Sequence, residues 1–181
     1  MKKYIALLRG INISGKNKIS MDELKNEFEY LGYKEIVTYL NSGNVIFKSD
    51  IDDGDIIKNN IQAMIKCKFN YDIPVYIITE QILRELLNNC PEWWGKDDKE
   101  IYDNIIFVIP PATYDEVFNA IGSPNEYEKI KEYKNNIFWS YSLKDYRKTN
   151  WWSKTASTHI SKSITIRTAN TMKKILEVCD R

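Results

Sequence analysis

Residues 35–48 read EIVTYLNSGNVIFK. Two runs rich in β-branched and aromatic residues flank the segment Asn41-Ser-Gly-Asn44, a composition typical of strands joined by a tight reversal. The stretch therefore predicts two strands, at residues 35–41 and 43–48, that pair as a hairpin. It decides the fold, because it places two consecutive strands between two helical segments.

The neighbouring segments complete a six-element order. Residues 3–9 form an apolar run that predicts a strand, and Ser20 with Glu23 fits the capping box that begins a helix. Apolar residues on one face predict a second helix at about residues 53–68, and a short strand follows at 73–78. The first half of the chain therefore reads strand-helix-strand-strand-helix-strand.

The same order recurs in the second half, where Asn135-Asn136 forms the hairpin turn. One added helix follows each six-element unit, at about residues 79–89 and from about residue 168. The predicted elements of this half are strands at 104–109, 128–134, 136–141 and 163–167, and helices at 113–121 and within 143–158.

This order is that of the ferredoxin-like split βαβ unit, an antiparallel sheet backed by helices. We therefore predict an α+β fold of two tandem ferredoxin-like (βαββαβ) subdomains with an added helix after each. The predicted boundaries are 1–80 for the first subdomain, 81–100 for a connecting helix and loop, and 101–181 for the second subdomain with its C-terminal helix.

The distribution of charge is more informative than the total. The 181 residues carry a formal net charge of +1, which by itself indicates neither a nucleic-acid binder nor a solubilising tail. Residues 1–20 nevertheless hold five basic side chains and no acidic one, and residues 144–174 hold eight basic side chains and one acidic one. These two basic stretches are where an anionic ligand is expected to bind.

The sequence indicates a cytoplasmic protein without a membrane segment. No apolar run approaches the roughly twenty residues of a membrane span, and the apolar run before Arg9 is too short for a secretory signal. The three cysteines, Cys67, Cys90 and Cys179, are at no metal-ligand spacing, which favours a reducing compartment. We therefore expect no metal and no cofactor.

Residues 9–18, RGINISGKNK, nearly match the phosphate-binding loop of nucleotide hydrolases, Gly-x4-Gly-Lys-Ser/Thr. Asn17 stands where that loop needs a hydroxyl for magnesium. The following helix is capped by Ser20 and does not begin at Lys16, so its N-terminus is misplaced for the phosphates. The sequence therefore argues against such a hydrolase.

The loop at residues 10–19 still has the chemistry of an anion site. It is longer than the usual two to six or so residues between a strand and a helix, and its glycines leave backbone N–H groups free to approach an anion. The alternative is a surface loop that packs Ile11 and Ile13 on the other subdomain while its lysines are solvated. The candidate ligand-binding residues here are Arg9, Gly10, Asn12, Ser14, Gly15, Lys16 and Lys18.

Further candidates come from the hairpin turn and from the second basic stretch. The turn residues suit a ligand only if the turn lies beside Arg9; otherwise they cap their own hairpin. Arg167 closes the last predicted strand as Arg9 closes the first, and both should face solvent if they receive an anion. These candidates are Asn41, Ser42, Asn44, Lys154 and Arg167.

Three stretches together resemble a bacterial family catalogued as domain of unknown function 1697. They read LRGINISGKN at 8–17, YLNSGNVIF at 39–47 and RTANT at 167–171. The resemblance implies two tandem ferredoxin-like subdomains and no particular activity. The third stretch departs from the family, because an Arg-Asn-Trp-Asn-like run is expected where this chain has Arg167-Thr-Ala-Asn170.

Three functions remain open. The one we favour is a binding module for a phosphate-bearing ligand, a nucleotide or a nucleic acid, that uses loop 10–19 and the stretch 144–174. The second is an enzyme that acts on a small anionic metabolite and clamps it with arginine and lysine. The third is a protein interaction module with an exposed tryptophan patch at 93–94 or 151–152. His159 has no paired base or nucleophile motif, so no catalytic residue is assigned.

Overall fold

The protein is described by a computed structural model of residues 1–181. The chain divides into two compact units, each built around a four-stranded antiparallel sheet. Unit 1 comprises Met1–Leu83 and Val178–Arg181, and unit 2 comprises Arg84–Glu177. Helix α3 (Glu80–Asn88) contains the boundary, so most of the segment predicted to connect the halves, 81–100, belongs to unit 2.

Unit 1 has the element order that the sequence predicted. Strands β2 and β3 pair as a hairpin that brings Tyr39 opposite Asn44. The Ser20 hydroxyl accepts a hydrogen bond from the Glu23 N–H at 3.4 Å and begins α1. This is the predicted N-cap, but only one of the two hydrogen bonds of the predicted capping box is formed. The sheet order is β2-β3-β1-β4, with every neighbouring pair antiparallel. The elements are β1 (Lys2–Leu8), α1 (Met21–Tyr30), β2 (Lys34–Tyr39), β3 (Asn44–Ser49), α2 (Gly54–Phe69) and β4 (Val75–Thr79).

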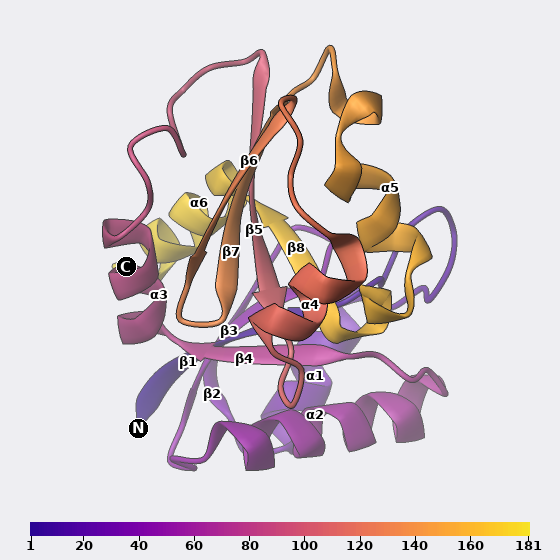
Figure 1. The fold of residues 1–181 in the computed structure, drawn as a ribbon. Helices are drawn as coiled ribbons and strands as arrows, with labels where there is room; N and C mark the ends of the chain where they lie inside the picture. Colours follow the sequence, from indigo (N-terminus) through magenta and orange to yellow (C-terminus); the bar gives the residue numbers. More distant parts are fainter. The chain divides into compact units, whose positions relative to one another are not determined.

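Both helices α1 and α2 cover one face of the unit 1 sheet (Figure 1). Side chains alternate along a strand, so every second residue of β1, from Tyr4 to Leu8, packs with the helices in one buried cluster. Three aromatic rings pack within it at tilted and edge-on angles: the centroids of Tyr33 and Phe47 are 4.6 Å apart, and those of Phe28 and Phe47 are 5.3 Å apart.

Unit 2 repeats the order, with sheet order β6-β7-β5-β8 and antiparallel neighbours throughout. Strand β5 begins three residues earlier than predicted, because Asp103 lies inside the strand and is buried. Its carboxylate accepts hydrogen bonds from the Gly95 N–H at 2.8 Å and from the Ser140 hydroxyl. The elements are β5 (Ile101–Val108), α4 (Tyr114–Ile121), β6 (Glu128–Tyr133), β7 (Asn136–Ser142), η1 (Tyr146–Lys148), α5 (Asn150–Ser157), η2 (His159–Ser163), β8 (Ile164–Thr168) and α6 (Ala169–Cys179).

The single helix predicted within 143–158 is divided into η1 and α5. Thr149 separates the two elements with extended backbone, and its hydroxyl accepts a hydrogen bond from the Trp152 N–H at the start of α5. Trp151 is fully buried, whereas Trp152 is 43% exposed. This confirms the prediction that the two tryptophans do not share one helix face.

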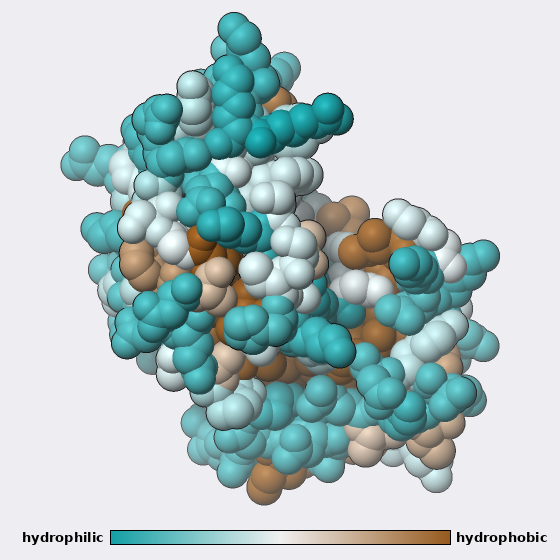
Figure 2. Space-filling view, turned by 45° about the vertical axis from the view of Figure 1, so that its right-hand side comes forward, coloured by the Kyte–Doolittle hydropathy of each residue, from teal (hydrophilic) through white to brown (hydrophobic).

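Helices α4 and α5 and one face of the β5–β8 sheet enclose the core of unit 2. Trp139 and Tyr141 of β7 lie on that face with ring centroids 4.6 Å apart, and both are buried. The alternating aromatics of β7 are therefore core residues, not a stacking platform for bases. None of the helices is long and apolar enough to cross a membrane, and the face shown in Figure 2 is mainly hydrophilic.

Candidate functional site

The loop between β1 and α1 has an unusual backbone. Gly10, Asn12, Ser14, Gly15 and Asn17 all have positive φ, between 49° and 77°. Each non-glycine residue in this region costs about 1–2 kcal/mol because its Cβ crowds the following carbonyl. A loop with three such residues persists only where specific contacts hold it.

Asn12 supplies those contacts. Its side-chain NH₂ donates to the carbonyl oxygens of Ile19 and Asn41, each at 2.9 Å, and its Oδ1 accepts from the Ile19 N–H at 2.9 Å. The amide therefore closes loop 10–19 and ties it to the hairpin turn between β2 and β3. Because these bonds use both amide hydrogens, Asn12 positions the loop; the expectation from the sequence that Asn12 donates to a ligand is not met.

Replacing Asn12 by alanine should lower the free energy of unfolding by about 2 kcal/mol, because three hydrogen bonds are lost and partly buried backbone groups lose their partner. Urea denaturation measures the change. Asn41→Ala is the matched control, since Asn41 contributes only its backbone carbonyl to this contact and should unfold like the parent. Equal losses in the two variants would show that the side chain of Asn12 is not the clamp.

The tip of the loop is a miniature hairpin. Ile13 and Lys16 form an isolated bridge, and the Lys16 N–H donates to the Ile13 carbonyl at 2.9 Å. The positive φ values of Ser14 and Gly15 at the corners are typical of a type I′ turn. Ile13 is 58% exposed, whereas Ile11 is fully buried. The alternative expectation, that both isoleucines pack on the other subdomain, is not met: Ile11 packs in the core of unit 1, and Ile13 is exposed.

The cationic side chains of this loop are in different environments. Lys16 and Lys18 are exposed and form no ion pair or hydrogen bond through their ammonium groups. In contrast, Lys2 and Lys48 of the same unit each pair with a carboxylate. Arg9 is half-buried, and burial lowers the pKa of its guanidinium. The two lysines are therefore the cations of the loop that are presented to solvent.

The hairpin turn lies beside the loop, but one of its predicted ligand residues, Asn44, points inward and engages a second, Ser42. Asn44 is buried, and its NH₂ donates to the Tyr39 carbonyl at 2.8 Å and to the Ser42 hydroxyl at 3.1 Å. Through these contacts, the side chains of the turn cap their own hairpin. Asn41 is exposed and remains accessible beside the loop.

The predicted ligand residues of unit 2 are engaged within that unit. Lys154 donates to the carbonyl of Ile121, at the end of α4, at 2.8 Å, where a cation is favourable. Arg167 is only 8% exposed and donates to the Thr165 hydroxyl and the Ile166 carbonyl, each at 2.9 Å. The expectation that Arg167 faces solvent is wrong, because β8 runs on to Thr168 and places Arg167 inside the strand ladder.

Most other cations of the stretch 144–174 also have partners. Only Lys144 and Lys162 are exposed without one, so the second stretch presents little unpaired positive charge. The engaged pairs are Arg147 with the Tyr146 hydroxyl, Lys148 with Asp145, Lys173 with the Gly95 carbonyl and Lys174 with Glu177.

The titratable side chains form no recognisable catalytic group. His159 is exposed, and no set of three or more His, Cys, Asp and Glu side chains is arranged to hold a metal ion. The three cysteines are free thiols. The arrangement therefore offers cations and backbone donors for binding but no assembled acid, base and nucleophile.

Comparison with known proteins gives a family and a fold. The chain is similar to the conserved bacterial protein SP0830 from Streptococcus pneumoniae, with 28% identity, a TM-score of 0.85 and 97% of each chain covered. No curated protein matches it. The family described as "Protein of unknown function (DUF1697)" matches residues 1–138. This range contains loop 10–19 and the hairpin turn but not the altered stretch 167–171. The chain belongs to the DUF1697 family.

Proposed function

We propose that this chain is a binding module for a phosphate-bearing ligand, a nucleotide or a nucleic acid, and that loop 10–19 of unit 1 is its site. One observation carries the proposal: Lys16 and Lys18 stand exposed and unpaired on a strained loop that Asn12 holds in one conformation. A pre-ordered loop loses little entropy on binding. Two lysine ammonium groups suit phosphate as point charges.

The backbone of the tip adds to these charges. The N–H groups of Ser14 and Gly15, the two corner residues of the exposed turn, make no hydrogen bond. Successive N–H groups in turn conformations form concave anion sites. The stretch 144–174 contributes less than its composition indicated, so the proposal now depends mainly on unit 1.

The fold and location belong to the same proposal. We infer that each unit is a ferredoxin-like βαββαβ module, since both have this element order and equivalent strand orders. We also infer a cytoplasmic location, which the three free cysteines favour. Modules of this fold carry many functions, so the binding proposal depends on the loop and not on the fold.

A ligand titration tests the proposal. A bound ligand should raise the free energy of unfolding by about 2.7 kcal/mol at a hundredfold excess over Kd, and ATP, a phosphosugar and a short RNA are suitable probes in a thermal-shift assay. The double variant Lys16→Ala, Lys18→Ala should weaken binding at least about tenfold, because two charge-assisted contacts are lost. Lys34→Ala is the control, since Lys34 is an exposed lysine at the far end of β2 from the turn.

Two outcomes would count against this site. If the double variant and the control bind the probe equally, the ligand lies elsewhere on the chain. If the parent shows no shift with any of the three probes at millimolar concentration, the binding proposal fails. An enzyme acting on a small anionic metabolite would give the same shift but would also convert the probe, which phosphorus NMR of the mixture detects.

A specific observation favours a second candidate, an interaction module that meets another copy of the chain. Tyr102, Tyr141, Trp152 and Tyr146 form a row of rings with successive centroids 5.7, 5.8 and 4.9 Å apart. Trp152 and Tyr102 are exposed in this row, and aromatic residues are enriched where interfaces bind most strongly. Light scattering should then show a dimer that Trp152→Ala converts to a monomer.

A further inference from the structure

A pocket of about 300 Å³ opens in unit 2 beside the start of β6 and the end of β7. This volume is at the lower end of the roughly 300–1,000 Å³ typical of small-molecule sites. Three aromatic side chains contribute to its lining: Trp93 from the segment after α3, Tyr127 from the residues before β6, and Tyr141 of β7. No residue of loop 10–19 lines this pocket, so it is independent of the phosphate site proposed above.

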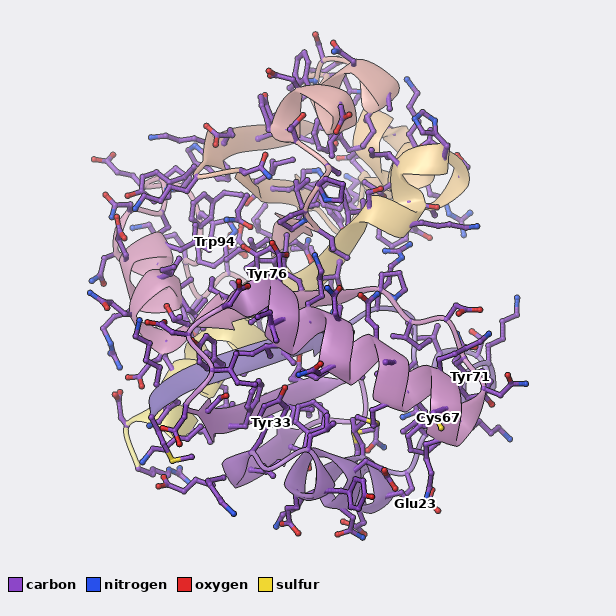
Figure 3. All side chains as sticks on the ribbon, turned by 90° about the horizontal axis from the view of Figure 1, so that it is seen from below. Glu23, Tyr33, Cys67, Tyr71, Tyr76 and Trp94 are labelled. Carbon is purple, nitrogen blue, oxygen red and sulfur yellow. The ribbon has the colours of Figure 1, made fainter.

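Trp93 is held at the pocket by the residue that follows it. Trp94 is buried, its indole N–H donates to the Asn104 carbonyl at 2.8 Å, and its ring meets that of Phe138 edge-on with centroids 5.1 Å apart (Figure 3). These contacts anchor the segment to β5 and β7. Trp93 itself is half-buried and contributes its side chain to the pocket.

The lining carries more negative than positive charge. Its charged residues are three acids, Glu126, Glu128 and Asp145, against one lysine, Lys129, if Asp103 and Lys148 beyond the lining are left aside. Glu128 accepts hydrogen bonds from N–H groups of the core, whereas Glu126 is exposed and forms no ion pair or hydrogen bond. The pocket therefore favours a cation, and Glu126 is the carboxylate that is free to meet it.

The chain already places one ammonium group against this lining. The Lys148 Nζ lies 5.0 Å from the centroid of the Tyr127 ring and 2.8 Å from the Asp145 carboxylate, and both partners line the pocket. Asp145 and, to a smaller extent, Tyr127 raise the pKa of Lys148 and so favour its charged form. An aromatic face and a carboxylate are the groups that attract organic ammonium ions.

The carboxylates that are still available decide which ammonium ion fits. A primary ammonium group has three N–H donors to satisfy, but Glu128 and Asp145 already accept hydrogen bonds or pair with a cation, which leaves Glu126. A quaternary ammonium ion has no N–H group and lies against aromatic faces through its methyl groups. The lining therefore suits a methylated ammonium ion better than a primary one.

We propose that this pocket binds a small quaternary ammonium group, with its methyl groups on the rings of Trp93 and Tyr127 and with Glu126 as the opposite charge. Lys148 lies on the same Tyr127 ring and therefore competes with the ligand. The group recognised is a trimethylammonium, carried either by a free ion such as choline or by a lipid headgroup.

Three probes of similar size test the proposal by isothermal titration calorimetry on the full chain. Choline should bind roughly tenfold more tightly than 3,3-dimethylbutanol, its uncharged isostere, which is the effect of a cation over aromatic rings. Ethanolamine, which has a primary ammonium in place of the trimethylammonium, should also bind more weakly than choline. No binding of choline at millimolar concentration, or equal affinity for choline and either of the other probes, would overturn the proposal.

Matched variants locate the site. Trp93→Leu should weaken choline binding roughly tenfold, and Glu126→Gln should weaken it several-fold while leaving the affinity for 3,3-dimethylbutanol unchanged. Glu92→Gln is the control, since Glu92 is an exposed acid beside Trp93 that does not line the pocket. An unchanged choline affinity in Glu126→Gln, or equal losses in Glu126→Gln and Glu92→Gln, would place the ligand elsewhere and overturn the proposal.

A gain of binding gives a second readout. Lys148→Met removes the competing ammonium from the Tyr127 ring and should tighten choline binding roughly threefold. Lys144→Met removes the same charge from an exposed lysine without a partner on the same segment and should tighten it less. Equal gains in the two variants, or weaker binding in Lys148→Met, would contradict the assignment of Lys148 as a competitor at this site.

Sedimentation with phosphatidylcholine vesicles separates the two sources of the group. A chain that binds choline but does not sediment with the vesicles takes the free ion, whereas co-sedimentation that Glu126→Gln reduces identifies the lipid headgroup.

Discussion

Replacing Glu128 by alanine is expected to lower the free energy of unfolding by about 3–5 kcal/mol, the cost of removing a buried charged group from its hydrogen-bond partners. Glu128 is 6% exposed, and its carboxylate accepts hydrogen bonds from the Trp139 indole at 2.9 Å and from the Asn150 N–H at 2.7 Å. The Trp151 N–H, 3.2 Å away, is a third donor. Without the carboxylate, the buried N–H groups of Trp139 and Trp151 and the partly buried N–H of Asn150 lose this partner.

The position of these donors explains the size of the effect. Asn150 and Trp151 are the first two residues of α5, whose N–H groups have no partner inside the helix. Glu128 therefore joins the start of β6 to the start of α5, and a negative charge there also interacts favourably with the helix dipole. Loss of Glu128 should loosen α5 from the sheet.

Urea denaturation measures the loss, with Glu126→Ala as the control. Glu126 is exposed two residues away and forms no ion pair or hydrogen bond, so its removal should change the free energy of unfolding by less than about 0.5 kcal/mol. Glu128→Gln keeps the shape and one acceptor oxygen and should give an intermediate value. A loss below about 1 kcal/mol in Glu128→Ala would mean that water replaces the carboxylate without penalty.

Replacing Gly43 by alanine should cost at least about 3 kcal/mol, because strain and overpacking add at this position. Gly43 has φ of +80°, and a Cβ there would lie 2.7 Å from the Leu8 Cβ and 2.9 Å from the Ile11 Cδ1. Leu8 is also joined to the turn by its N–H, which donates to the Gly43 carbonyl at 2.8 Å. Since Leu8 ends β1 and Ile11 is the second residue of loop 10–19, the variant should also weaken binding at that loop.

Gly15→Ala separates the two contributions. Gly15 has nearly the same φ, +77°, but a Cβ at this position would meet no atom within 4 Å. Its cost should be the backbone strain alone, about 1 kcal/mol. Thermal or urea unfolding of both variants checks the difference, and equal costs would indicate that the turn moves away from Leu8 and Ile11 to accept the methyl group.

The element order was readable from the sequence because it depends on local signals. The hairpin at 35–48 follows from strand residues around a turn, and the start of α1 follows from Ser20 and a partner three residues later. The missed boundaries have a physical cause. Strand β5 begins at polar residues, and Asp103 is accepted in a strand only because Gly95 and Ser140 hydrogen-bond to it.

The candidate site was predictable in place but not in detail. Residues 1–20 hold five bases and no acid, and this composition located the loop whose exposed lysines support the proposed function. Composition does not say which way a side chain points. The side-chain amides of Asn12 and Asn44 were both expected to bind a ligand. In the structure, both amides instead donate hydrogen bonds to backbone carbonyl oxygens.

The sequence by itself determined the α+β order, the hairpins and the place of the basic loop, because each follows from residues within a few positions of one another. Only the tertiary structure decided which polar groups are engaged. Asn12 meets Asn41 across 29 positions, and Glu128 meets Trp151 across 23. Such contacts form between segments that are distant in the sequence. The local periodicity of the sequence does not specify which distant segments come together.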